Sequence, residues 1–209
     1  MLALESRLRL SVTSSWSPTR PRLFGEASGR PVYGRDRMNL STNTELLDCA
    51  AQRAMRIYIR AGIGEGPTSL AAFDSALVAA GVANYNLLCL SSVIPPNARI
   101  VRARRTTPPD EYGCRLYVVL SQMRQNHHGR HAHAGLGWIQ QEATGHGLFV
   151  ELHDSDRARL EHGLHVTLDA MRAVRALTYG SVQTEIASVQ CLHRPVCALV
   201  VAVYSCEPW

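Results

Sequence analysis

The sequence predicts an α+β fold in which a largely antiparallel sheet system is flanked by helices. Two observations predict it: segments with strand character outnumber those with helical periodicity, and most links between successive strands contain no helix. The length of 209 residues and the hydrophobic content of 46% suffice for one domain of ordinary size with a single core.

The N-terminal region differs in composition from the rest of the chain. Residues 1–54 are rich in Ser, Arg, Pro and Thr and show no sustained apolar period. We therefore expect a disordered extension over 1–54 and a folded domain over 55–209.

The folded domain opens with a strand followed by a helix. Apolar and charged residues alternate from Arg56 to Ala61, which predicts a strand that ends in the glycines at positions 62, 64 and 66. Pro67 and Thr68 then begin a helix, and Gly81 ends it. Its apolar residues recur at helical spacing and are Leu70, Phe73, Leu77 and Ala80.

Further apolar runs predict several more strands, with one long helix among them. The strands are expected over 86–90, 115–120, 132–138, 148–151, 183–192 and 196–205. Apolar residues recur every three or four positions from Leu160 to Leu177, which predicts the helix. Residues 154–156 offer caps for its start, and Gly180 ends it.

Composition excludes several classes of protein. No apolar run approaches the roughly 18–20 residues that a membrane-spanning helix needs. Charges interrupt the N-terminal leucines, so we expect no secretion signal and a cytoplasmic location. The six cysteines are scattered without a CxxC pair, which is typical of reduced thiols. The formal charge of +5 comes from dispersed arginines without interleaved aromatic residues, so no nucleic-acid partner is indicated.

A pair of serines, Ser91 and Ser92, lies at the end of an apolar strand, just before Pro95 and Pro96. Prolines restrict the backbone, and such a site can hold a strained peptide bond that the second hydroxyl attacks. Attack at the preceding carbonyl replaces the amide with an ester. Elimination and hydrolysis then turn the serine into a pyruvoyl group, a built-in ketone. Without its surroundings, the pair more simply indicates an ordinary turn.

Two other patterns indicate chemistry only weakly. The glycines at 62, 64 and 66 are similar to a phosphate-binding loop, but they lack the GxxxxGK[ST] lysine and the dinucleotide spacing. Histidines at 127, 128, 131 and 133 could bind a metal, chiefly through His131 and His133 on one face of a strand, yet their surroundings are typical of an exposed loop. We therefore predict neither a phosphate site nor a metal site.

Residues 62–98 combine four motifs in one order. They are the glycine-rich opening, Phe73-Asp74-x-Ala76-Leu77, Asn84-Tyr85-Asn86-Leu87 and Leu90-Ser91-Ser92-x-x-Pro95-Pro96. Together they resemble the pyruvoyl-dependent arginine decarboxylases. The resemblance continues less densely through 135–138 and 147–151 into the long helix, and covers about residues 56–206.

The resemblance implies that the chain cleaves itself between Ser91 and Ser92, leaving a pyruvoyl group derived from Ser92 at the start of the larger chain. It also implies a four-layer αββα sandwich, assembled as a homotrimer or hexamer with active sites at subunit contacts. The implied activity converts L-arginine to agmatine and CO2 through a Schiff base with the pyruvoyl group, without pyridoxal phosphate or a metal.

The resemblance also assigns roles to individual side chains. Glu151 matches the family's proton donor, and we expect desolvation at the end of an apolar strand to raise its pKa and keep it protonated. Asp74 matches a substrate-recognition residue, which we expect on or beside the buried face of its helix, facing a guanidinium. Asn86 matches an active-site asparagine that could donate to an oxyanion or to the substrate carboxylate, and Ser91 is expected to contact substrate as well.

Without the resemblance, these three residues have simpler interpretations. Glu151 would be a carboxylate at a solvated strand end, Asp74 an ion-pair partner of one of the arginines, and Asn86 a residue at a strand edge.

Two features depart from the family pattern. Ala83 stands where the family usually has glycine, which brings the turn before Asn84 into question because alanine tolerates positive φ poorly. The N-terminal extension has no counterpart in the family's core. Two alternatives stay open: an unprocessed homologue acting as a structural or regulatory subunit, and a pyruvoyl decarboxylase of another amino acid.

Overall fold

The computed structural model describes residues 55–103, 107–175 and 177–209. The extension predicted over 1–54, including Cys49, lies outside these residues. The described strands are β1 (Arg56–Glu65), β2 (Asn86–Cys89), β3 (Val93–Ile94), β4 (Arg99–Arg102), β5 (Arg115–Gln125), β6 (His131–Gln140), β7 (Gly147–Asp154), β8 (Gln183–Gln190) and β9 (Val196–Glu207). The helices are α2 (Ser69–Ala80), α3 (Arg157–Ala173) and the 3₁₀ turn η1 (Pro109–Glu111).

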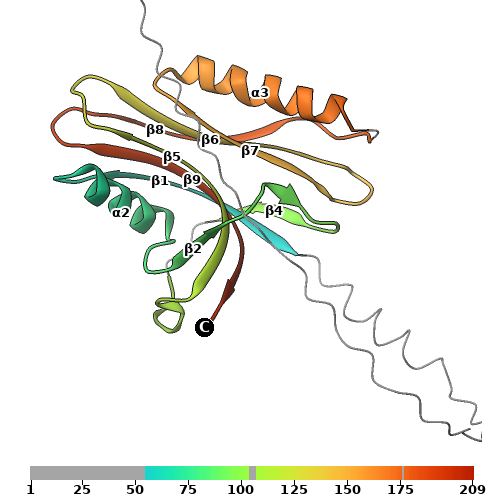
Figure 1. Ribbon diagram of the computed structural model, residues 1–209, viewed down its shortest axis with the longest axis horizontal. Coiled ribbons are helices and arrows are strands. Elements are labelled where there is room, and N and C mark those ends of the chain that lie inside the picture. Colours follow the sequence, from blue (N-terminus) through green and yellow to red (C-terminus); the bar gives the residue numbers. More distant parts are fainter. Residues whose placement is uncertain (1–54, 104–106, 176) are drawn as a thin grey trace, which may run out of the picture. The chain divides into compact units, whose positions relative to one another are not determined.

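Two sheets and two helices form four layers (Figure 1). One sheet has five strands in the order β2-β5-β9-β1-β4, and the other has four in the order β3-β7-β6-β8. Every pair in the four-stranded sheet is antiparallel, whereas the outer pairs β1–β4 and β2–β5 of the larger sheet are parallel. The predicted α+β class with mainly antiparallel sheets is confirmed, and the layers agree with an αββα sandwich. The periodicity did not predict the short strands β3 and β4.

Strand β1 includes the first two glycines of the glycine-rich opening, Gly62 and Gly64, and ends at Glu65, within the stretch where its end is predicted. A Cβ atom at Gly62 would lie 2.2 Å from the carbonyl oxygen of Ala76, and one at Gly64 would lie 2.3 Å from that of Ala72. No side chain fits there, so the helix backbone rests directly on the strand. This close packing, and not a phosphate, accounts for the alternate glycines.

The same packing selects the buried face of α2. The helix begins after Thr68, whose side chain accepts from the Ala71 amide and caps it, and ends at Gly81 in the left-handed conformation. Its buried residues are Ala72, Ala76 and Ala80. Leu70, one of the apolar residues at helical spacing, is exposed, because only alanine-sized side chains fit against the glycines of β1.

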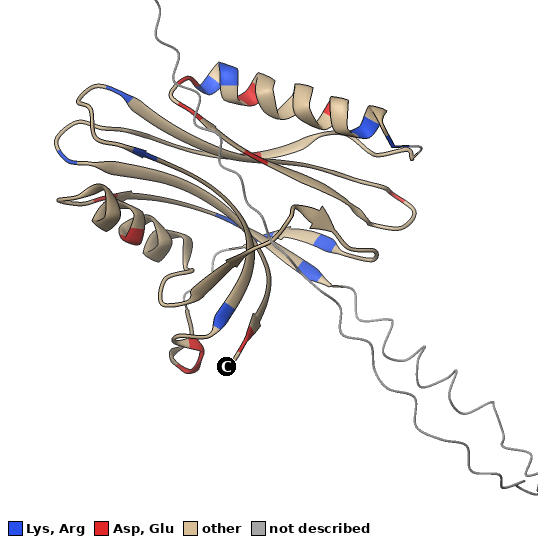
Figure 2. Cartoon of the chain, in the orientation of Figure 1, with Lys and Arg blue, Asp and Glu red and all other residues tan. Residues whose placement is uncertain are grey.

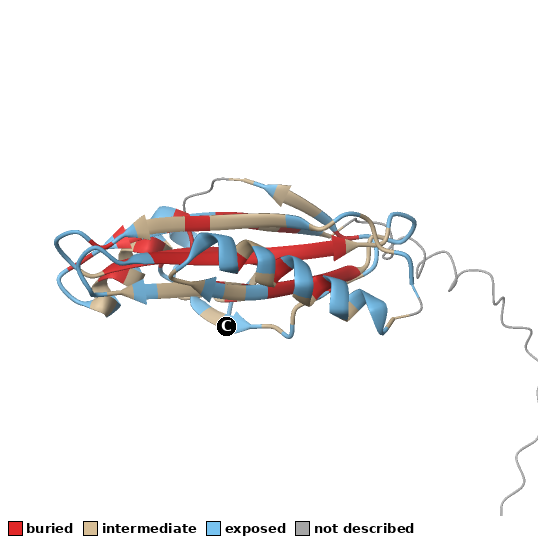
Figure 3. Ribbon diagram, turned by 90° about the horizontal axis from the view of Figure 1, so that it is seen from above, coloured by how far each residue is buried: buried red, intermediate tan, exposed pale blue. Residues whose placement is uncertain are grey.

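The second helix, α3, covers the four-stranded sheet. Asp156 caps its start, and its leucines at 160, 164 and 168 are buried, with Leu164 and Leu168 against the glycines of β6. Its outward side carries arginines near both ends and acidic residues between them (Figure 2), and that side is exposed (Figure 3). The helix ends at Ala173, earlier than predicted, and Val174 just beyond it is exposed.

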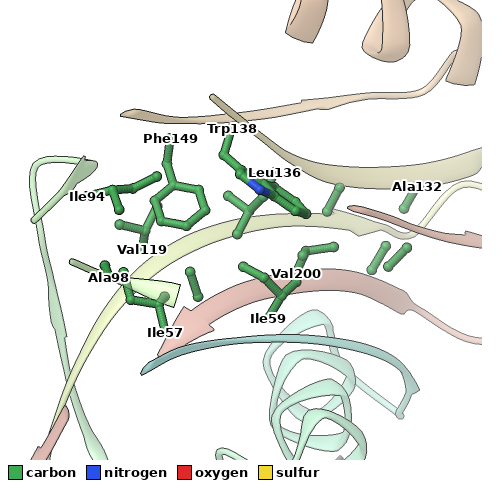
Figure 4. Close-up of a cluster of buried hydrophobic side chains, with 14 residues drawn as sticks. Ile57, Ile59, Ile94, Ala98, Val119, Ala132, Leu136, Trp138, Phe149 and Val200 are labelled. Carbon is green, nitrogen blue, oxygen red and sulfur yellow. The ribbon is translucent and has the colours of Figure 1, made fainter. Parts of the chain in front are cut away.

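The main core lies between the two sheets (Figure 4). Phe149 and Trp138 from the four-stranded sheet meet Ile57, Ile59 and Val200 from the larger sheet. Ile94 of β3 joins this core with no exposed surface, and it lies only two residues after Ser92. The segment that follows the serine pair is therefore anchored by hydrophobic burial.

Two sequence expectations concern cysteines and membranes. The five cysteines of the described residues, at 89, 114, 191, 197 and 206, are free thiols. In the same part of the chain, no helix combines the length and the hydropathy that crossing a bilayer would require.

Candidate functional site

The serine pair lies where the chain passes from one sheet to the other. Immediately before it, the Leu90 amide donates to the Val118 carbonyl and continues the pairing of β2 with β5. Immediately after it, Val93 pairs with Leu148 of β7. The peptide bond between Ser91 and Ser92 therefore connects a strand of the larger sheet to a strand of the smaller one.

Ser92 has a strained backbone. Its φ is +63°, in the left-handed region that costs a residue with a Cβ atom roughly 1–2 kcal/mol. The other non-glycine residues with positive φ in the described ranges are Asn84 and Asn97, and asparagine tolerates this region far better. Strain of this kind persists where the surrounding structure fixes it, and it is concentrated at functional sites.

The Ser92 hydroxyl lies against a carboxylate. Its Oγ donates to Glu151, at 2.9 Å from Oε1 and 2.8 Å from Oε2. Serine is a weak nucleophile until a neighbouring group accepts its proton, and a carboxylate at this distance is such a group. The structure therefore joins two residues that are 59 positions apart in the sequence.

Glu151 is exposed in this chain, which corrects the prediction of a desolvated carboxyl at a strand end. It lies within β7, opposite Leu136 of β6, on the face of the sheet that also carries Phe149. On the other side of β7, the short strand β3 pairs only with Leu148 and Gly147. The sheet edge beside Glu151 is therefore left open by β3.

Two further groups hold the backbone after Ser92, and the sequence analysis missed both. The Phe149 amide donates to the Ser92 carbonyl at 2.8 Å, and the Tyr204 hydroxyl donates to the Val93 carbonyl at 2.9 Å. Burial, and secondarily the Glu151 carboxylate, raise the pKa of the Tyr204 phenol. Tyr204 had a signal in the sequence, because it is a polar-tipped aromatic residue that closes the apolar run of β9.

Asp74 and Asn86 do not join Ser92 within this chain. Both are exposed, and across the described residues no hydrogen bond or ion pair links either of them to Ser92 or Glu151. The Asn86 side chain donates to the Gly113 carbonyl at 2.7 Å. The expectation that Asp74 lies on or beside a buried face is wrong, because the small residues of α2 occupy that face.

The turn before β2 accommodates alanine at position 83. Ala83 is not among the residues with positive φ; the neighbouring Asn84 takes the left-handed conformation instead, at +66°. The departure from glycine therefore leaves the turn intact.

Two of the four histidines stack on each other. His131 and His133 lie in β6 with stacked rings 5.5 Å apart, and His133 Nδ1 contacts the Ser188 hydroxyl at 2.8 Å. Burial, and secondarily the neighbouring His131, lower the pKa of His133. In the stretches that the structure describes, no three His, Cys, Asp or Glu side chains gather closely enough to bind a metal.

A described cavity lies elsewhere. It measures about 780 Å³ and is lined by β1, the end of α2 and parts of β4 and β8, including Arg60, Val78 and Glu185. None of the predicted site residues lines it.

Comparison with known proteins gives a family for this arrangement. The family model described as pyruvoyl-dependent arginine decarboxylase matches residues 56–207. The chain is 41% identical over 70 residues to the pyruvoyl-dependent arginine decarboxylase of Methanothermobacter thermautotrophicus, a match that covers 34% of this chain and 46% of the relative. It is 39% identical over 99 residues to the protein of that name from Halobacterium salinarum, covering 47% and 61%.

One shorter match has a higher identity. Over 37 residues the chain is 62% identical to the pyruvoyl-dependent arginine decarboxylase of Methanopyrus kandleri, which covers 18% of this chain and 25% of the relative. The matches to the first two relatives span about half of each relative's length. Because the family model spans nearly all of the described domain, the chain belongs to the pyruvoyl-dependent arginine decarboxylase family.

Proposed function

We propose that this chain cleaves itself between Ser91 and Ser92, and that the pyruvoyl group formed from Ser92 serves the decarboxylation of L-arginine to agmatine and CO2. One observation carries the proposal. In a chain of this family, the Ser92 hydroxyl is hydrogen-bonded to the Glu151 carboxylate while the Ser92 backbone is in the left-handed conformation.

The cleavage uses only groups of the chain and one water molecule. Glu151 takes the hydroxyl proton as Ser92 Oγ bonds to the Ser91 carbonyl carbon; the Ser91–Ser92 amide C–N bond breaks and its nitrogen gains a proton. The resulting ester loses the Ser92 α-proton, and its Cβ–O bond breaks to release the Ser91 carboxylate. Water then replaces the nitrogen of the dehydroalanine at position 92, which leaves as ammonia.

The surroundings of Ser92 fit a pyruvoyl group. The carbonyl that follows the new ketone is the present Ser92 carbonyl, which accepts from the Phe149 amide, and this bond can persist after cleavage. A pyruvoyl ketone bonds with the amino group of an amino acid and draws away the electrons released with CO2. Glu151 lies within hydrogen-bonding distance of the Ser92 side chain, so it can deliver a proton to the carbon that has lost CO2.

Substrate recognition requires groups beyond this pair. A carboxylate binds a guanidinium through two parallel hydrogen bonds, and Asp74 is exposed on α2 and available for this role. Asn86 and Ser91 are exposed as well. Because Asp74 and Asn86 are not bonded to the Ser92 site of their own chain, we infer that they complete the site of a neighbouring copy in a homotrimer or hexamer.

Mass spectrometry of the denatured protein, with and without phenylhydrazine, tests the cleavage. We expect two chains that meet between Ser91 and Ser92, whose masses sum to the intact chain plus water minus ammonia. Only the C-terminal chain should react with phenylhydrazine. A single unreactive chain would overturn the proposal and favour an unprocessed subunit, which should then co-purify with a processed homologue.

The substrate is tested separately on the cleaved protein. Release of CO2 from carboxyl-labelled arginine, ornithine and lysine should be greatest for arginine, because only its guanidinium can bind a carboxylate through two parallel hydrogen bonds. Efficient release from another amino acid, with none from arginine, would retain the pyruvoyl chemistry and reject the substrate.

A further inference from the structure

Tyr204 occupies an irregularity in the pairing of β5 with β9. Tyr117 is opposite Ser205 and Val118 is opposite Val203, so Tyr204 is an additional residue on β9 without a partner. Such a bulge bends its strand and redirects side chains, and bulges are common next to active sites. Beside this bulge, the Tyr204 ring packs edge-on against Phe149 of the other sheet, with centroids 6.3 Å apart.

The Tyr204 hydroxyl contacts the backbone close to the proposed cleavage point. It donates to the carbonyl of Val93, the residue that follows Ser92, at 2.9 Å. One peptide earlier, the Phe149 amide donates to the Ser92 carbonyl at 2.8 Å. The two consecutive carbonyls after the scissile bond therefore each accept a hydrogen bond. One donor belongs to the smaller sheet and the other to the larger sheet.

This pair of hydrogen bonds acts where the backbone is strained. Ser92 has φ of +63°, and the side chain of Val93 is 58% exposed, so side-chain burial at Val93 does little to fix the segment. Backbone hydrogen bonds and the burial of Ile94 remain as the restraints on this segment. Of this pair of hydrogen bonds, the one from the Tyr204 hydroxyl comes from the opposite sheet.

We propose that Tyr204 is a positioning residue for self-cleavage: through the Val93 carbonyl, its hydroxyl holds Ser92 in the left-handed conformation in which Oγ lies against Glu151. This role rests on the proposed function, because it requires that the chain cleaves itself. Tyr204 is not itself a catalytic residue, because its hydroxyl bonds to a backbone carbonyl and not to the reacting atoms.

The test compares Tyr204→Phe with Tyr117→Phe. Tyr117 belongs to the same bulge, but its hydroxyl donates to Glu207, at 3.1 Å and exposed to solvent, so it is a matched control. Each full chain is synthesised with a pulse of labelled methionine, and the labelled fraction that has been cleaved is followed with time. Tyr204→Phe should slow cleavage about fivefold or more, the equivalent of one neutral hydrogen bond. Tyr117→Phe should match the wild type.

Two readouts separate positioning from a general loss of structure or from proton transfer. The ratio of wild-type to Tyr204→Phe cleavage rates should stay constant between pH 6 and pH 9, whereas a residue that transfers protons would give a ratio that changes with pH. In chains kept intact by Ser92→Ala, adding Tyr204→Phe should speed hydrogen exchange at the Phe149 amide while leaving α3 unchanged.

Each outcome has a defined consequence. Cleavage of Tyr204→Phe at the wild-type rate, or unchanged exchange at Phe149, would overturn the positioning role. Equal slowing by both tyrosine variants would also overturn it, because the hydrogen bond to Val93 would not be the cause. If neither the wild type nor Tyr117→Phe is cleaved, the proposed function fails and the role in cleavage fails with it; a defect confined to Tyr204→Phe supports both.

Discussion

The residues proposed for cleavage and those proposed for substrate recognition differ in how far one chain assembles them. Ser92 lies just before β3, Glu151 in β7 and Tyr204 in β9. Within one chain, Ser92 is hydrogen-bonded to Glu151, and Tyr204 is hydrogen-bonded to the carbonyl of the next residue, Val93. Asp74 and Asn86 lie exposed on α2 and β2, and the Asn86 side chain donates to the Gly113 carbonyl. The residues proposed for cleavage are thus brought together by the folding of one chain, whereas those proposed for recognition are not.

This difference suggests an order of events. A peptide bond that must break once can depend on contacts formed as the chain folds. Substrate binding can wait until copies associate, since exposed carboxylate and amide groups remain available to a ligand. Variants of Ser92 or Glu151 should therefore affect cleavage or the chemical step, whereas variants of Asp74 should affect substrate binding alone.

The largest expected effect is the loss of the Ser92 hydroxyl. Ser92→Ala removes the nucleophile, so we expect an intact chain that does not react with phenylhydrazine and has no detectable decarboxylase activity. Intact mass and CO2 release measure this result. Ser155→Ala, which alters a serine near α3, should be cleaved normally. A Ser92→Ala chain that still divides between positions 91 and 92 would end the proposal.

The next largest effect concerns Glu151. In Glu151→Gln the amide oxygen can still accept from Ser92 Oγ, so we expect cleavage to occur, although more slowly. The amide cannot supply a proton, and loss of a general acid should lower decarboxylation per pyruvoyl group by about 10²–10⁴-fold. Phenylhydrazine titration counts the pyruvoyl groups, and CO2 release gives their turnover. Full turnover per pyruvoyl group would exclude Glu151 as the proton donor.

A variant of Asp74 tests the proposed substrate recognition. Asp74→Asn should raise KM for arginine by roughly 10- to 100-fold, since a hydrogen bond between charged groups is worth about 1.5–3 kcal/mol. Cleavage should continue at the wild-type rate, because no described bond joins Asp74 to Ser92. The control is Asp169→Asn, at another exposed helical aspartate, which pairs with Arg172. An unchanged KM would remove Asp74 from the substrate site.

How much the sequence predicts depends on the range of the interaction. Periodicity and capping residues locate α2, α3 and most strands, because these signals are local. The role of the glycines of β1 is not evident from the sequence, since alternate glycines are typical of a loop as well as of a strand covered closely by a helix. Only the structure, with the Ala72 and Ala76 backbones against them, distinguishes the two.

The site follows the same rule. Ser91 and Ser92 form a local motif and are found from the sequence. The exposure of Glu151 depends on where β3 stops, and the position of Tyr204 depends on a bulge between two distant strands. Neither leaves a periodic signal, because both arise from register between segments far apart in the chain.

The smallest expected effect is a change with pH in the free energy of unfolding. It tests whether the Tyr204 phenol is shielded from solvent beside Ser92 and Glu151. Burial first, and Glu151 second, raise the pKa of Tyr204 above the ordinary tyrosine value of 10.0. At pH 8 the phenol is neutral in both folded and unfolded chains, so its hydrogen bond should contribute about 1 kcal/mol. Above pH 10 the unfolded chain ionises while the folded chain stays neutral, so this advantage should shrink as the pH rises.

Urea unfolding of Ser92→Ala with and without Tyr204→Phe, at pH 8 and pH 11, measures that advantage in uncleaved chains. Burial also raises the pKa of Cys197 and Cys206, each to about 11, but both variants retain these thiols, so their effect cancels in the difference. A gap between the two variants that stays constant or widens at pH 11 would mean that the phenol ionises as freely in the folded chain as in the unfolded one. Tyr204 would then be an accessible surface group. Its hydrogen bond would not restrain the Ser92 segment, and Tyr204 would resemble the exposed residues Asp74 and Asn86 in this respect.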